Sequence, residues 1–398
     1  MESDNLAFKE KGEINQIKST NKLKNIKSNF ILKKVFNNLE KKKLLDIVKY
    51  NKNIKERINI DNKDFKEYSE KYSSIEIEIK IVENKYCKFI NIKNEDEIYY
   101  HIYLNNKKKE IKMKDTKKGE KIKIIKIIID YQVKSFEKLF SDCGYIESIN
   151  FKKFYRNNIN NMNNMFYWCS SLKELNLNNF NTNNVTNMNH MFSGCSSLKE
   201  LNLNNFNTNN VTNMDFMFYG CSSLKELNLN NFNTNNVTNM VHMFDGCSLL
   251  KELNLNNFNT NNVTNMGHMF SGCSSLKELN LNNFNTNNVT DMSSMFYRCS
   301  SLNELNLNNF NTNNVTNMSS MFDGCSSLKE LNLNNFNTNN VTSMYFMFSE
   351  CSSLKELNLN NFNTNNVHTM YRMFSGCSNE LIMKIKMQYK NIKGEAFR

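Results

Sequence analysis

The sequence predicts an α/β solenoid, a stack of 26-residue coils that each hold one strand and one short helix, with a small N-terminal α+β cap region. Three observations lead to this fold class. From Cys143 to Cys377 a cysteine recurs with a constant 26-residue period. In each unit, leucines alternate with polar residues as they do along a strand. Met, Met, Phe and Cys then follow at the spacing of one helical face.

Residues 1–60 divide into two expected segments. Residues 1–19 are predicted to be disordered, at the start of the basic half of the chain. Residues 20–60 are predicted to be helical, because apolar residues recur there at helical intervals. The spacing of Phe36 and Leu39 loosely resembles the helical core of an F-box, although the proline usually found near the start of that motif is absent.

Residues 61–130 are predicted to form a β-rich cap region. The stretch SSIEIEIKI at 74–82 alternates strictly between apolar and polar residues, which is typical of a half-buried strand. FINI, IYYHIYL and KIKIIKIIID are also expected to be strands, and the last leads directly into the repeats.

The repeats are expected to occupy residues 131–387, followed by a tail at 388–398. A divergent first copy is recognisable because Cys143 stands one 26-residue period before Cys169, and Leu139 and Phe140 align with Met165 and Phe166. A terminal unit has a neighbour on one side only, so divergence is expected there.

A single coil can be divided by its periodicity. In the coil that starts at Leu224, Leu227 and Leu229 face one side of a short strand, and Phe232 follows as an anchor. An Asn-rich turn comes next. Thr238 is expected to cap a helix that carries the Met, Met, Phe and Cys residues and ends near a glycine.

Stacking would bury these faces continuously. Parallel strands lie about 4.8 Å apart, whereas helix axes need about 8–10 Å. We therefore expect a parallel sheet of about nine strands on the concave side and wider spacing on the helix side.

The repeat resembles a known family. LxxLxL within a period of 20–29 residues is the leucine-rich-repeat signature, and FNTNNVTNMxxMFxGCSSLKELNLN is similar to the 26-residue repeat of BspA-like surface proteins and of mycoplasma-type lipoproteins. The resemblance covers about residues 131–387 and implies a cell-surface adhesion or host-interaction role. One departure is Phe232, which stands where ordinary leucine-rich repeats place an inward Asn.

The sequence argues against an enzyme. It contains no phosphate-binding glycine loop, nucleophile elbow, HExxH or EF-hand motif, and no cofactor or metal is expected. His242 and His268 would lie about 8–10 Å apart on neighbouring helices, too far to share one zinc ion. The cysteine column is expected to be buried, reduced and too widely spaced to form disulfides.

The charge pattern gives little indication of a charged partner. Residues 1–160 carry 37 Lys/Arg and 24 Asp/Glu, a net charge of +13, whereas residues 161–398 carry 14 and 15, a net charge of −1. Acidic residues are interspersed among the lysines, so no nucleic acid is expected as a partner. The sequence shows neither a transmembrane segment nor a signal peptide. The chain as written is expected to be a cytoplasmic monomer, whereas the family resemblance implies the cell surface.

Variation between near-identical coils points to candidate binding residues. The two residues inside each Met-x-x-Met, and a third position soon after, change from coil to coil on the face away from the core. Aromatic and basic residues are enriched there, as at protein interfaces. Drift at exposed positions after recent duplication would give the same pattern. The candidate protein-binding residues are Phe216, Tyr219, Tyr297, Arg298, Tyr345, Phe346, Tyr371 and Arg372.

Three function classes remain open at this point. The first is a non-enzymatic protein-binding module of the BspA-like adhesion type. The second is an intracellular adaptor, in which an F-box-like N-terminus docks a partner machine while the repeats select clients. The third is a purely structural repeat protein.

Overall fold

The computed structural model describes residues 26–37, 52–59, 62–83, 85–116 and 121–398, in two compact units, Met1–Ser73 and Ser74–Arg398. The segment expected to be disordered, residues 1–19, lies outside the described residues. So do 20–25, 38–51 and 60 of the expected helical region, and the second of these stretches holds Leu39.

The described part of the first unit is helical. It comprises α2 (Asn29–Asn37), α4 (Lys52–Arg57) and α5 (Asn62–Tyr72). Ser28 accepts a hydrogen bond from the backbone N–H of Ile31 at the start of α2. The Arg57 side chain donates to Asn29 and to the Ile26 carbonyl, which ties α4 to the start of α2. Leu32 is buried, whereas two other apolar residues of α2, Ile31 and Val35, are exposed.

The second unit begins with a six-stranded sheet in the order β3-β2-β4-β1-β5-β6. The bounds are β1 Ile75–Ile81, β2 Tyr100–Leu104, β3 Glu110–Ile111, β4 Ile125–Ile129, β5 Ile146–Lys153 and β6 Glu174–Asn176, with a 3-10 helix η1 at Asn94–Tyr99 before β2. Three of the four strands expected in the cap are therefore present. FINI is not a strand, although Phe89 and Ile90 are buried. Because β5 pairs antiparallel with β1 and parallel with β6, the sheet continues from the cap into the first repeats.

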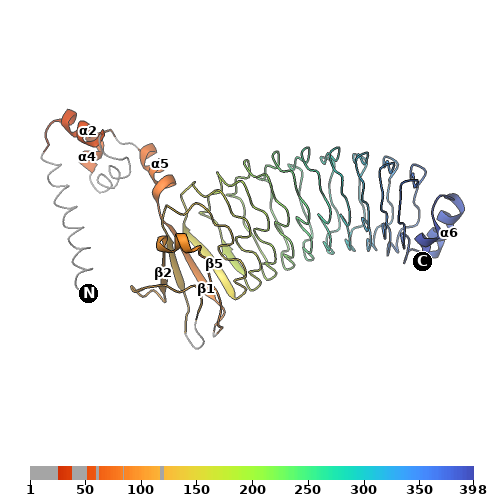
Figure 1. Cartoon of the computed structure of the whole chain (residues 1–398), viewed down its shortest axis with the longest axis horizontal. Helices are drawn as coiled ribbons and strands as arrows, with labels where there is room; N and C mark the ends of the chain where they lie inside the picture. Colours follow the sequence, from red (N-terminus) through yellow and green to blue (C-terminus); the bar gives the residue numbers. More distant parts are fainter. Residues whose placement is uncertain (1–25, 38–51, 60–61, 84, 117–120) are drawn as a thin grey trace. The chain divides into compact units, whose positions relative to one another are not determined.

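Beyond β6 the coils follow one another side by side (Figure 1). Parallel backbone bridges connect positions one 26-residue period apart, from Ser135↔Asn161 to Ser343↔Thr369. The 26-residue register is confirmed, and Ser135 shows that it begins before the near-identical copies. Polar ladders join the Asn-rich turns as well: Thr208 Oγ1 donates to the Asn233 carbonyl at 2.9 Å and accepts from the Asn233 N–H at 2.7 Å.

The prediction of a short helix in each coil is wrong: among residues 155–378 the structure has successive turns instead. Within one coil the Ser193 N–H bonds the His190 carbonyl. The Phe192 and Gly194 N–H groups alternate with these bonds and reach the Met217 and Tyr219 carbonyls of the next coil, at 3.0 and 2.7 Å. Two residues per coil adopt positive φ, for example His190 at 53° and Gly194 at 75°. Turns of about four residues place Met, Met, Phe and Cys inward just as a helix would. The spacing of these residues in the sequence therefore fits both a run of turns and a helix.

The expected nine-stranded parallel sheet is also not formed. Within the described residues the Leu-x-x-Leu-x-Leu stretch is a strand only in β6. In later coils, Asn side chains connect this stretch to the preceding coil. Asn257 Nδ2, for example, donates to the Leu229 carbonyl at 3.0 Å and to the Phe232 carbonyl at 2.5 Å. We call the side of the coils that carries the Met-x-x-Met-Phe segments the turn face. It was expected to be the widely spaced side, but it carries the regular backbone bonds between coils. The expected difference in spacing between strands and helices therefore does not apply.

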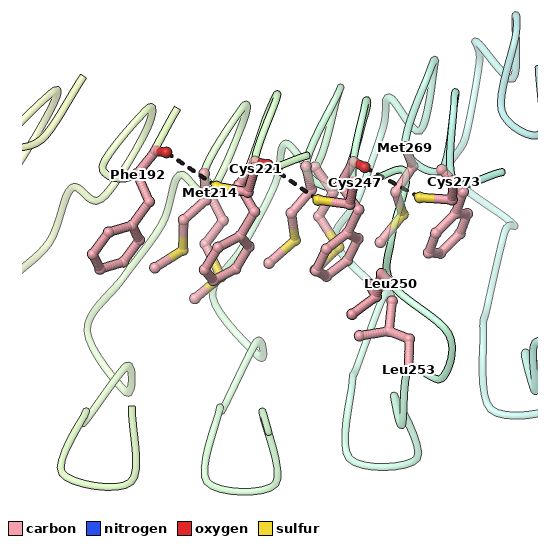
Figure 2. Close-up of a cluster of buried hydrophobic side chains, with 14 of the residues drawn as sticks. Phe192, Met214, Cys221, Cys247, Leu250, Leu253, Met269 and Cys273 are labelled. Atoms are coloured by element: carbon pink, nitrogen blue, oxygen red, sulfur yellow. Dashed lines mark hydrogen bonds between the residues drawn. The ribbon is translucent and has the colours of Figure 1, made fainter. Parts of the chain in front are cut away.

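The core lies between these two faces and is continuous along the stack. Every coil buries the Leu, Val, Met, Phe and Cys side chains at its repeated core positions. Figure 2 shows part of this core, with Phe192, Met214 and Cys221 from two successive coils. Phe rings of adjacent coils stack with centroids 5.7 Å apart for Phe192–Phe218, which fixes a close spacing along the turn face.

The last coil is covered by α6 (Asn379–Gln388) and a short 3-10 helix η2 (Gly394–Phe397). Ser378 caps α6 by accepting from the Leu381 N–H at 3.2 Å. The segment expected to be a tail supplies the missing next layer: Phe374 N–H bonds the Ala396 carbonyl at 2.9 Å, and Phe397 stacks on Phe374.

Candidate recognition surface

The three variable positions of each coil lie on the turn face. The second residue of each Met-x-x-Met adopts positive φ, between 53° and 58° from His190 to Arg372. All eight candidate residues lie outside the buried core; Arg298, Tyr345 and Arg372 are exposed and the others are partly buried. The left-handed backbone at this column is unusual for non-glycine residues, and glycine or asparagine would signal it more clearly.

Phe216 lies in the middle of a stack of four rings. Its centroid is 4.4 Å from that of His190 on one side and 4.4 Å from that of His242 on the other. His242 in turn stacks on His268 at 4.2 Å. Tyr219 packs at the edge of this stack, 5.6 Å from Phe216. We refer to His190, Phe216, Tyr219, His242 and His268 as the histidine stack.

The other six candidates form two groups. Arg298 lies over the ring of Tyr297, 5.0 Å from its centroid, and Arg372 lies over Tyr371 at 5.2 Å. Tyr345 and Phe346 meet edge to face at 4.2 Å, and the Tyr371 ring is 6.1 Å from each of them. The four residues Tyr345, Phe346, Tyr371 and Arg372 are called the C-terminal aromatic cluster. The coil between the two groups presents Ser319 and Ser320, so no ring of that coil connects them.

Tyr167 and Trp168 are two further aromatic residues on this face that are absent from the sequence-based set. Trp168 is 49% exposed and adopts φ 54° at the position that most later coils fill with glycine. Its indole lies against Gly194, where an added Cβ would be 3.0 Å from a ring carbon. Trp168, Arg298 and Glu350 replace the glycine that most coils have at this position. Comparing the coils at this position could therefore have identified Trp168 as a surface residue from the sequence.

Burial shifts the pKa of several groups on this face toward the neutral form. It lowers the pKa of His190 and of His268, and nearby histidine charge adds to the effect in both. Burial raises the pKa of the Asp215 and Asp323 carboxyl groups against the attraction of His190 and Arg298 respectively. The turn face therefore holds aromatic rings together with histidines and acids whose charge is disfavoured by burial.

The expected separation of His242 and His268 is wrong. Their ring centroids are 4.2 Å apart, well below the roughly 8–10 Å expected between neighbouring helices. Backbone hydrogen bonds between turns set the coil spacing, and no helices intervene. His242 Nδ1 lies 2.7 Å from Asp245 Oδ2. One donor atom each from His242, Asp245 and His268 lie within 4.8 Å of one another.

The cysteine column is free and buried, as expected, from Cys143 to Cys377. Wide spacing between helices was expected to keep these cysteines apart, but the coils that the structure describes contain no helices. Instead each Sγ from Cys169 onward is directed to a backbone carbonyl, as for Cys221 and Phe192 at 3.2 Å. Burial raises the pKa of the thiol, to about 12 for Cys221 and Cys299.

The repeats identify the protein's relatives. The family described as "Mycoplasma protein of unknown function, DUF285" matches residues 134–227, 219–306 and 304–390. The chain belongs to this family. Its matches cover the coils and the start of the C-terminal segment. No curated protein matches the chain.

A solved structure with some similarity is the crystal structure of a leucine-rich repeat protein from Bacteroides ovatus ATCC 8483. The identity is 17%, the match covers 68% of this chain and 88% of that chain, and the TM-score is 0.28. Among the described residues, no helix has the length and apolar character needed to cross a membrane.

Proposed function

We propose that this member of the family is a non-enzymatic protein-binding repeat protein of the leucine-rich-repeat, BspA-like type, and that it contacts its partners through the turn face. The observation that carries the proposal is the division of roles within each coil. Core positions and the Asn and Thr ladders are kept nearly constant, whereas the residues that differ between coils gather on one face, as partly exposed rings and arginines.

The C-terminal aromatic cluster is the strongest candidate for direct contact. Tyr345 is 41% exposed, and Arg372 and Tyr371 already form a stacked pair, so little side-chain freedom would be lost on binding. Tyr and Arg are the residue types that most often dominate the energy of interfaces.

A second candidate surface is the groove between α6 and the leucine face of the last coils. It is lined by charged and polar side chains that include Lys329, Glu330, Lys355 and Glu356. These Lys and Glu positions vary little between coils, so they offer less discrimination among partners. The groove is therefore the alternative binding surface in the test.

The intracellular adaptor remains the alternative function. In its favour, α2 exposes Phe30 (73%) and Ile31 (53%), an apolar pair of the kind that docks on another protein. If the N-terminal unit is the docking element, a Phe30→Ser, Ile31→Ser variant of the full chain should lose its partner while the turn-face variant below keeps it.

The test begins with full-length protein as bait for lysate and surface extracts of its source cells, after which one captured protein is purified for measurement of Kd. Replacing the C-terminal aromatic cluster by serine should weaken binding at least about tenfold, or about 1.4 kcal/mol. Serine occurs at the equivalent positions of other coils, so folding should be retained, which circular dichroism checks.

The matched control replaces Lys329, Glu330, Lys355 and Glu356 by serine in the same two coils. If that variant loses the partner and the aromatic variant keeps it, the turn-face proposal is wrong and the groove is the binding surface. If no purified partner binds the wild-type chain, the protein is a structural repeat.

A further inference from the structure

His242, Asp245 and His268 form a constellation that occurs once among the described repeats. His242 and His268 occupy the same column in successive coils, and Asp245 lies three residues after His242 on the same face. The coil before them has Phe216 and Tyr219 in these places, and His190 is followed by Ser193. The set is therefore not a by-product of the repeat.

The three side chains offer two imidazole nitrogens and one carboxylate oxygen within 4.8 Å of one another. Three donors around a tetrahedral zinc ion, each about 2.0–2.2 Å from it, lie roughly 3.4 Å apart. Closing the observed cluster to that size needs movements of about 1 Å, and all three side chains are partly exposed. Mixed imidazole and carboxylate donors favour zinc, copper or nickel over magnesium or calcium.

We propose that His242, Asp245 and His268 bind one divalent transition-metal ion, with zinc as the best-fitting metal, on the turn face of the coils. The contact between His242 Nδ1 and Asp245 Oδ2, at 2.7 Å, already brings these two side chains together, and where these two atoms are the ligands the ion takes the place of the proton that they share. The backbone beneath is held by bonds between coils, such as His242 N–H to the Gly267 carbonyl at 3.0 Å.

Metal binding also requires a change in ring orientation. The two imidazole rings are stacked with an interplanar angle of 13° and centroids 4.2 Å apart, so their in-plane lone pairs lie in two nearly parallel planes. One ring must tilt toward the other for both nitrogens to reach the same ion. Three protein ligands leave a fourth tetrahedral position open to water or to a side chain of another protein. The site is independent of the proposed function but lies on the same face.

The test is titration of chelator-treated full-length protein with ZnCl2 by isothermal calorimetry, together with the visible absorption of the protein with Co²⁺. Wild-type protein should bind one ion per chain with a tetrahedral cobalt spectrum. His242→Phe and His268→Phe keep a ring in the stack, as Phe216 does naturally, but remove a donor. Each should weaken binding at least about tenfold, as should Asp245→Ser.

The matched control is His190→Phe, the same change in the same column outside the cluster, which should leave zinc affinity unchanged within about twofold. The proposal is overturned if wild-type protein takes up no zinc, if His190→Phe weakens binding as much as His242→Phe, or if cobalt shows thiolate charge-transfer bands. The last result would place the ion on the cysteine column.

Discussion

The Sγ of Cys247 donates a hydrogen bond to the backbone carbonyl of Phe218 in the preceding coil, 3.2 Å away. Figure 2 shows the same bond in the coils on either side, from Cys221 and from Cys273. The thiol thus stays protonated and serves as a link between neighbours. Burial raises the pKa of Cys247 well above its usual range.

The first prediction is that these thiols are inert in the folded protein. Because the thiolate is the reactive form, a thiol reagent at pH 8 should label the column from Cys143 to Cys377 slowly in native protein and completely after denaturation. Mass spectrometry of tryptic peptides measures the labelling of each cysteine. Rapid native labelling of most of the column, or disulfides between successive coils, would contradict the packing described here.

The second prediction concerns the core of a central coil. Phe232→Ala or Leu227→Ala should lower the free energy of unfolding by about 2–5 kcal/mol, because each leaves a cavity in a continuous core. Asn202→Ala, at an exposed position whose side chain accepts one local N–H, should cost under about 1 kcal/mol. Urea denaturation measures all three. Similar losses at Phe232 and Asn202 would mean that the inward and outward faces are misassigned.

The third prediction uses the glycine column. Gly246 has φ +75°, and an added Cβ would lie 3.3 Å from the Gly220 Cα, so Gly246→Ala should cost about 1–2 kcal/mol. Glu350 adopts φ 56° at the equivalent position and is exposed. Glu350→Gly should therefore stabilise the protein, by up to about 1 kcal/mol after the greater chain entropy of glycine is counted. Opposite signs of the two changes in melting temperature are the expected result; the same sign in both would rule out a conformational origin.

The fourth prediction concerns pH. Burial raises the pKa of Asp323 above 3.8, with the charge of Glu350 adding to the effect and Ser349 and Arg298 opposing it. The folded state therefore holds this proton more tightly than the unfolded state, so the charged carboxylate destabilises the fold at neutral pH and not below about pH 3.8. Asp323→Asn should raise the melting temperature at pH 7, with a gain in unfolding free energy of less than about 1 kcal/mol, and the gain should shrink as pH falls to 4. A gain independent of pH would assign the effect to packing.

Several features of the fold could be predicted from the sequence because burial alone encodes them. The 26-residue register follows from the cysteine column, and inward residues such as Leu229 and Phe232 are apolar in every coil. The strands β1, β2 and β4 were readable from alternation or apolar character. The register, the inward residues and these strands all follow from the pattern of apolar residues, which the sequence shows directly.

The backbone path between the buried residues could not be predicted. The spacing of Met240, Met243, Phe244 and Cys247 fits a helix and a run of turns equally well, and residues such as His242 and Phe216 give no sign that they adopt positive φ. The error carried over to the candidate site. With helices assumed, the coils were spaced too widely, so neither the stacking of Phe216 on two histidines nor the proximity of His242, Asp245 and His268 could be anticipated.

The bonds from each coil to its neighbour, and from the last coil to Glu395 and Ala396, have a consequence for how such a protein can evolve. Every coil presents the same donors and acceptors to the next, so an in-frame gain or loss of one whole 26-residue unit joins matching surfaces and leaves both ends of the stack intact. An insertion of any other length would shift the Thr and Asn ladders out of register. Copy number can therefore change in whole coils, and each added coil brings a fresh set of three outward positions on which selection can act.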